Sequence, residues 1–153
     1  MTYSKRAKIF LFGVLGLIAA FLLFLIFAWS TFDVSEAGRH SMAYQLAAPG
    51  HLRDVEIIGE CRPPKYRWKG RDGMGVPFSS LNYGSSAPTT DIFKIYRQAF
   101  ASHSCKIETS IPESKSGNLL ILFCDSQNLS SIQIFIADNS KCSDIVISFI
   151  GNN

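Results

Sequence analysis

Residues 9 to 29, IFLFGVLGLIAAFLLFLIFAW, decide the architecture of the chain. None of these 21 residues carries a charged side chain. As a helix the segment is about 31 Å long, close to the thickness of a bilayer's hydrocarbon core. Unpaired backbone groups are costly in lipid, so a single span must be helical. The sequence therefore predicts a transmembrane helix over residues 9 to 29, preceded by a short tail, residues 1 to 8.

The charges that flank this helix predict its orientation. Three cations, Lys5, Arg6 and Lys8, precede it, whereas all 12 acidic residues of the chain lie after residue 30. The positive-inside rule then keeps the tail in the cytoplasm and carries the rest across the membrane. The other 12 of the 15 basic residues balance the acids, so the net charge of +3 comes from the tail alone. This charge gives no reason to expect nucleic acid as a partner.

A cleaved signal peptide is the alternative interpretation of the apolar segment. The apolar core of a signal peptide usually has about 7–15 residues, which is shorter than this run. Ala28-Trp29-Ser30 nevertheless offers a small-x-small cleavage pattern. No cysteine ends the run, which argues against a bacterial lipoprotein. Residues 31 to 153 suffice for one domain with its own core.

All four cysteines lie beyond the predicted helix, on the oxidising side of the membrane. An even number of cysteines in that location predicts two disulfides rather than free thiols. Zinc is the competing interpretation, but the chain has no C-x-x-C pair and no H-x₃₋₅-H spacing, and His103-x-Cys105 is its one close pair. No metal site is expected. The predicted disulfide residues are Cys61, Cys105, Cys124 and Cys142.

Residues 30 to 50 are expected to form a juxtamembrane stalk. Their apolar residues show no firm helical spacing, although residues 41 to 48 can form a short helix before Pro49-Gly50 ends it. The alternative to a stalk is that this short helix packs on a partner.

Residues 51 to 153 are expected to form a small extracytoplasmic α+β domain, with one main helix packed on a mainly antiparallel sheet of about five strands. The helix begins at Thr89 or Thr90, where a hydroxyl can cap it, and its apolar residues recur at helical spacing. Residues 62 to 75, rich in cations and glycine, read as a loop or irregular hairpin. Alternating or apolar runs bounded by turn residues mark two strands before the helix, 55–61 and 76–83, and three or four after it, among 105–109, 119–124, 132–137 and 145–150.

The register of the hairpin around residues 112 to 117 suggests how the cysteines pair. If the turn is centred between residues 114 and 115, Cys105 lies directly opposite Cys124, within reach of a disulfide. Cys61 is then left to pair with Cys142. A slip of one residue breaks this reasoning, so the other two connectivities stay open.

The stretch from Arg62 to Arg71 is the most suggestive surface feature. Its cations can bind lipid phosphates, an anionic envelope polymer or an acidic protein surface, and its aromatic rings suit the headgroup level of a membrane. The alternative is a solvated hairpin whose cations pair with the nearby Asp54, Glu56, Glu60 and Asp72. The candidate partner-binding or anion-binding residues are Arg62, Lys65, Tyr66, Arg67, Trp68, Lys69 and Arg71.

Small residues within the apolar segment suggest a contact between membrane helices. Gly16 and Ala20 form a small-x-x-x-small pair, and Gly13 lies one turn earlier. Small residues let helices approach closely in lipid, although such pairs also arise by chance. The phenylalanines of the segment are expected to face lipid rather than a cofactor.

Catalytic patterns are missing from the sequence. The three histidines, His40, His51 and His103, stand outside any nucleophile motif, and no glycine-rich phosphate loop is present. We therefore expect no cofactor and no enzymatic activity. An envelope hydrolase or redox enzyme would need a reactive residue in a cleft.

Two functional hypotheses follow. The leading one is a non-enzymatic, single-pass accessory or assembly subunit of a larger membrane protein complex. The alternative is an anchored binding module that holds an anionic polymer, lipid or protein surface through residues 62 to 71. Both place the N-terminus in the cytoplasm and the C-terminal domain outside it. A homo-oligomer is the other partnership that the small-residue pattern allows.

Overall fold

The computed structural model describes residues 3–71, 73–101, 104–113 and 117–152. The chain divides into two compact units, Met1–Phe32 and Asp33–Asn153. The first unit is a single helix, α1 (Tyr3–Phe32). Its segment Ala7–Trp29 is long and apolar enough to cross a membrane, and it contains the predicted span. This length and composition fit both a membrane anchor and a signal sequence.

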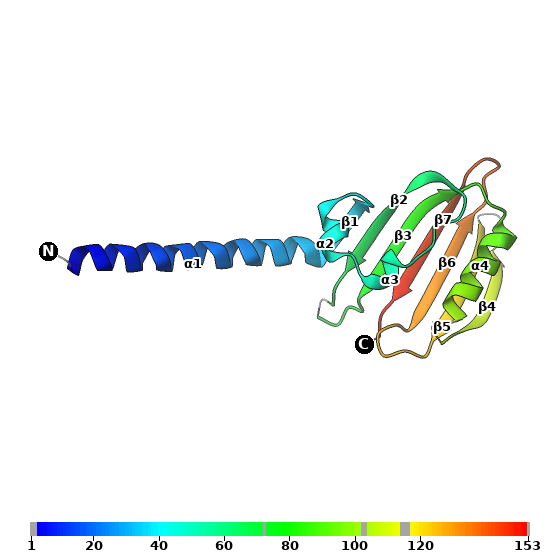
Figure 1. Ribbon diagram of the computed structural model, residues 1–153. Helices are drawn as coiled ribbons and strands as arrows, with labels where there is room; N and C mark the ends of the chain where they lie inside the picture. The colour runs from blue at the N-terminus through cyan, green and yellow to red at the C-terminus, as the bar shows by residue number, and fades with distance from the viewer. Residues whose placement is uncertain (1–2, 72, 102–103, 114–116, 153) are drawn as a thin grey trace. The chain divides into compact units, whose positions relative to one another are not determined.

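The second unit is built on a seven-stranded sheet with the order β1-β2-β3-β7-β6-β5-β4 (Figure 1). Every neighbouring pair is antiparallel. The α+β class and the antiparallel sheet are as predicted, but the expected number of about five strands is wrong. The strands are β1 (Asp33–Gly38), β2 (Glu60–Lys69), β3 (Phe78–Ser85), β4 (Cys105–Glu113), β5 (Gly117–Cys124), β6 (Ser131–Ala137) and β7 (Ser143–Ile150).

The sheet includes residues that were expected to lie outside it. β1 occupies part of the predicted stalk, so the folded unit begins at Asp33 instead of residue 51. β2 occupies most of the predicted basic loop, whereas residues 55 to 59 form no strand. The register of β2 shifts between Arg62 and Lys65. Pro63 and Pro64 lie at this shift, where a missing N–H costs no regular ladder bond.

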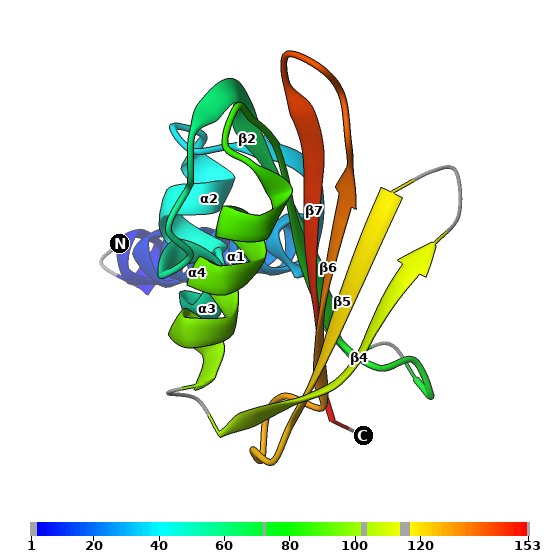
Figure 2. The same ribbon diagram turned by 90° about the vertical axis from the view of Figure 1, so that its right-hand side faces the viewer.

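Three helices cover one face of the sheet: α2 (Met42–Ala47), α3 (Gly50–Arg53) and α4 (Thr89–Ala101) (Figure 2). α4 is the helix predicted to start at Thr89 or Thr90. It carries the chain from β3, near the middle of the sheet, to the edge strand β4. The strands β4 to β7 then return as a meander until β7 pairs with β3.

The core lies between these helices and the sheet. α4 contributes Ile92, Tyr96 and Phe100, which are buried at helical spacing. The sheet contributes every second residue of its central strands, as expected for a sheet with one face under helices. These buried side chains include Leu81, Tyr83, Leu120, Leu122, Ile132, Ile134, Ile136, Ile145, Ile147 and Phe149.

Candidate functional site

The face of the sheet opposite the helices is a surface on which a site could form. In the part of the chain that the structure describes, no helix of the second unit lies over this face (Figure 2). We call it the uncovered face. Its residues alternate with the core residues along each strand, so strand register determines which of them are neighbours. One row across the sheet pairs Lys65 with Asn82, then Val146, Phe135 and Leu119.

Three neighbours in this row are apolar, and we call them the apolar row: Val146 on β7, Phe135 on β6 and Leu119 on β5. All three are half-buried. They stand apart from the hydrophobic core on the helix side. Phe123, further along β5, is 49% exposed. The uncovered face therefore offers apolar contact area on its β5–β7 half.

The other half of the uncovered face is basic. Lys65 and Arg67 on β2 are exposed and alternate with Tyr66 and Trp68. These two rings are buried in the core, with only 2% and 4% of their surfaces exposed. The structure therefore does not place Tyr66 and Trp68 at the surface beside the predicted cations. Successive side chains of β2 point to opposite faces of the sheet, so the predicted basic residues and the predicted aromatic residues lie on different faces.

A groove of about 910 Å³ runs along the uncovered face. The end of β1, the turn after it and the first half of β2 supply most of its charged residues, β7 supplies Asp144, and β6 supplies Phe135 and Ala137. The charged side chains that line it are Glu36, Arg39, Glu60, Arg62, Lys65 and Asp144, together with His40. It thus joins the basic half of the face to the apolar row.

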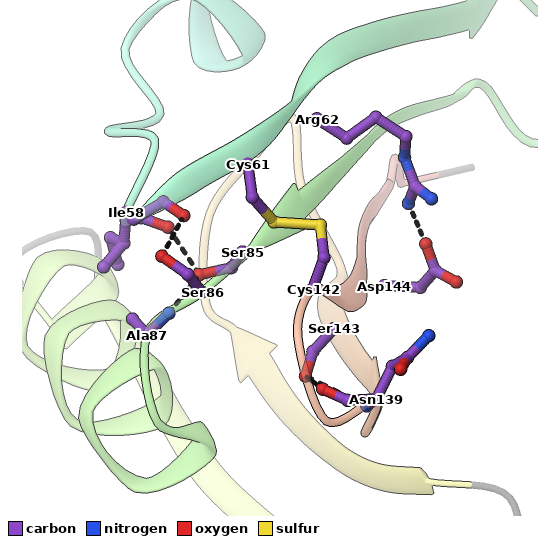
Figure 3. The surroundings of a disulfide bond; sticks show 11 residues. Ile58, Cys61, Arg62, Ser85, Ser86, Ala87, Asn139, Cys142, Ser143 and Asp144 are labelled. Atoms are coloured by element: carbon purple, nitrogen blue, oxygen red, sulfur yellow. Dashed lines mark hydrogen bonds and ion pairs between the residues drawn. A yellow bond between two sulfur atoms is a disulfide. The ribbon is translucent and has the colours of Figure 1, made fainter.

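The formal charges in this groove are paired. Arg62 pairs with Asp144 across β2 and β7 (Figure 3). The Lys65 ammonium lies 3.1 Å from a Glu36 carboxylate oxygen, and an Arg39 guanidinium nitrogen lies 3.8 Å from Glu60. The alternative interpretation of the basic stretch predicted that its cations pair with nearby acids. Two of these three acids, Glu36 and Asp144, come from distant segments of the chain.

Glu36 reaches Lys65 from an unusual backbone conformation. Its φ is +57°, and it lies at the register shift between Val34 and Ala37. A left-handed backbone is strained for a residue with a Cβ, and a bulge changes the direction of the side chain it carries. Strain of this kind is concentrated at functional sites. The sequence pattern gave no indication of this residue, because it lies in the segment predicted to be a stalk.

Both disulfides lie in the second unit. Cys61 is bonded to Cys142 and Cys105 to Cys124, which is the pairing that the hairpin register favoured. Cys105 and Cys124 face each other directly, and a register shift between Ile107 and Thr109 follows nearer the turn. The Cys61–Cys142 bond lies beside the Arg62–Asp144 ion pair at one end of the groove (Figure 3).

The remaining predicted site residues lie apart from the groove. Arg67 stacks its guanidinium over the ring of Phe78, 5.2 Å from the ring centroid. Arg71 donates a hydrogen bond to the backbone carbonyl of Asn152. Lys69, at the end of β2, pairs in register with Asp33 and Phe78.

The predicted helix-helix contact residues Gly13, Gly16 and Ala20 all lie in α1. A Cβ added at Gly13 or Gly16 would meet no atom within 4 Å. Close approach by another helix stays a prediction.

A second, smaller cavity lies on the helix side of the sheet. It has a volume of about 160 Å³ and is lined by His51, Glu56, Tyr96, Phe100 and Phe149, among others. His51 lies at the surface, but its ring packs on Phe149 and its Nε2 lies 2.5 Å from Ser79 Oγ. Loss of solvent around the imidazole lowers the pKa of His51, and the nearby Asp54 opposes this shift.

A serine and a histidine in contact suggest a nucleophile and its base, but Ser79 is only 3% exposed and does not line the cavity. The contact between His51 and Ser79 instead links α3 to β3. In the described part of the chain, no three His, Cys, Asp or Glu residues are placed to hold a metal ion.

No protein-family model, curated protein or solved structure matches the chain. These comparisons therefore assign it neither a family nor a function.

Proposed function

We propose that the chain is a non-enzymatic accessory or assembly subunit of a larger membrane protein complex. The helix α1 anchors it, and the uncovered face of the sheet docks on a neighbouring protein. The observation that carries this proposal is the apolar row, Val146, Phe135 and Leu119, on a sheet face that no described helix of the second unit covers. Sheets bury an apolar face against a second layer, and apolar area left outside a fold is characteristic of interaction sites.

Two further features support the proposal. The disulfides join β2 to the turn before β7 and β4 to β5, so the sheet that presents the face is cross-linked across β3 and at its β4 edge. The paired charges in the groove leave its Glu36, Lys65, Arg62 and Asp144 side chains in defined positions. A preorganised surface loses less side-chain entropy when a partner binds.

The experiment that tests the proposal is extraction of native membranes with a mild detergent, followed by size analysis of the full-length chain. A subunit co-migrates in fixed stoichiometry with a large assembly. Migration as a monomer or as a small homo-oligomer overturns the proposal.

The alternative proposal is an anchored module that binds an anionic polymer, lipid or protein surface. It is supported by three cations, Lys65, Arg67 and Lys69, which occupy every second position of β2 and therefore lie on one face of the strand. The ion pair between Lys65 and Glu36 weakens it, because an added anion must compete with a carboxylate already 3.1 Å away. Salt-sensitive binding of the full chain to anionic vesicles, lost when Lys65, Arg67 and Lys69 are reversed to Glu, would favour this alternative.

A further inference from the structure

We infer that the uncovered face receives a protruding segment of a partner protein, with apolar side chains on the apolar row and a carboxylate beside Arg67. This inference rests on the proposed function and specifies the kind of partner surface that the subunit fits. It follows from three properties of the face: its shape, its unequal halves and the charge on Arg67.

The shape of the face selects a protein segment over a bilayer. The groove reaches from the turn after β1 across Asn82 to Phe135, so the surface is hollowed where its charged and apolar halves meet. Side chains that enter the headgroup region must protrude by several ångströms. Phe135, Val146 and Leu119 are instead half-buried among neighbouring strands. A concave surface of this kind is filled by a ridge or an extended segment of another protein.

The charge on Arg67 selects a carboxylate on that segment. Within the part of the chain that the structure describes, Arg67 belongs to no ion pair, whereas Arg62 and Lys65 each have an acidic partner. Its guanidinium lies over Phe78, and the planar N–H fork can still hold a carboxylate while it is stacked. Arg67 pairs in register with Ser80, which faces Ser148 and then Gln133 on the same side of the sheet. A row of polar residues therefore extends across the sheet from Arg67, beside the position of the expected carboxylate.

The unequal halves of the face argue against a second copy of the chain as the occupant. A two-fold pair of sheets packed face to face places β2 either over β2 or over the strands on the far side of β7. In the first arrangement, Lys65 and Arg67 of one copy face Lys65 and Arg67 of the other copy. The second brings these cations against Leu119 and Phe135. Both arrangements leave the charge on Arg67 without an acidic partner at the interface, which costs free energy.

Photo-cross-linking in native membranes tests this inference. The full-length chain carries benzoylphenylalanine in place of Phe135, which keeps an aromatic ring at the site. The matched control carries it in place of Gln98, an exposed residue of α4 on the helix side. We expect a light-dependent adduct from position 135 and none from position 98. The cross-linked peptide should contain apolar residues and an Asp or Glu.

Charge reversal identifies the carboxylate contact. Arg67→Glu should lower the yield of the adduct several-fold, whereas Lys94→Glu, the same change at an exposed position of α4, should leave it unchanged. Peptide mapping that finds both disulfides intact shows that the variants fold.

Three results would overturn the inference: an adduct with another copy of this chain, an adduct with lipid, or no adduct while the chain still co-migrates with a large assembly. The last result leaves the subunit function standing, whereas migration of the chain alone removes that function as well.

Discussion

Gly84 on β3 lies directly beneath the sulfur of Cys142. A Cβ at position 84 would come 2.5 Å from Sγ of Cys142 and 2.7 Å from Cβ of Arg62. The Cys61–Cys142 disulfide links β2 to the turn before β7 across the intervening strand β3. The disulfide therefore passes over Gly84, the one residue of β3 without a side chain.

Gly84→Ala should destabilise the second unit. The added methyl group overlaps the disulfide, and overpacking of this kind costs about 1–3 kcal/mol. Thermal unfolding followed by circular dichroism should show a lower melting temperature. Gly50→Ala is the matched control, because a Cβ there meets nothing within 4 Å and Gly50 is helical. Equal melting temperatures for the two variants would contradict the close approach at Gly84.

Peptide mapping under non-reducing conditions should recover Cys61 joined to Cys142 and Cys105 joined to Cys124. This pairing requires the antiparallel register that places Cys105 opposite Cys124. A peptide that joins Cys61 to Cys105 or to Cys124 would show that the register is wrong.

The sequence predicted the elements whose patterns are local. The apolar run predicted the N-terminal helix, the capped amphipathic stretch predicted α4, and the alternating runs predicted β6 and β7. β1 was missed because its sequence, DVSEAG, has only two inward residues, Val34 and Ala37, and they are separated by a bulge. β2 was missed because Pro63 and Pro64 read as the end of a strand. They lie at a register shift that the sequence pattern does not show.

Tyr96→Phe should destabilise the second unit more than Tyr83→Phe. The two buried hydroxyls are 2.7 Å apart, and Tyr96 donates to the carbonyl of Glu56 at 2.8 Å. Tyr83 must then be the donor to Tyr96. Removal of the Tyr96 hydroxyl leaves both the Tyr83 hydroxyl and the Glu56 carbonyl without this partner, and the buried Tyr83 hydroxyl left unsatisfied costs about 1–3 kcal/mol.

Tyr83→Phe removes only the donor to Tyr96 and leaves the bond to Glu56 in place. Chemical denaturation of the two variants measures the difference in the free energy of unfolding. A larger loss for Tyr83→Phe would contradict this donor order.

His51 should make stability depend on pH in the mildly acidic range. The pKa of His51 is lower in the folded protein than its usual value near 6.5, because packing removes solvent from the ring. As the pH falls below about 6.5, the unfolded chain binds a proton first. The stability that neutral His51 contributes is therefore lost progressively as the pH falls further.

The matched variant for this effect is His51→Gln, which retains a polar side chain but does not titrate. Its free energy of unfolding should change less than that of the unsubstituted protein between pH 7 and pH 5. Parallel curves for the two proteins would show that His51 is not responsible.

The candidate site was only partly predictable, because it combines segments that are far apart in sequence. The basic stretch predicted cations at the surface, and Lys65 and Arg67 are exposed, but the strand that carries them turns Tyr66 and Trp68 into the core. Glu36 and Asp144 enter the groove through strand pairing, which no local pattern shows. One indication of the apolar row was present. The run from Leu119 to Phe123 is apolar at every position, and a strand with one solvated face usually alternates.

The measurement that tests the central claim most directly compares two full-length variants after mild detergent extraction from native membranes. Phe135→Glu places a charge within the apolar row, and Gln98→Glu places the same charge on the exposed side of α4. If the uncovered face docks on a larger complex, the Gln98→Glu chain co-migrates with that complex and the Phe135→Glu chain, with both disulfides formed, does not. Co-migration of both variants with the complex would contradict the account. So would the absence of co-migration for the unsubstituted chain and both variants.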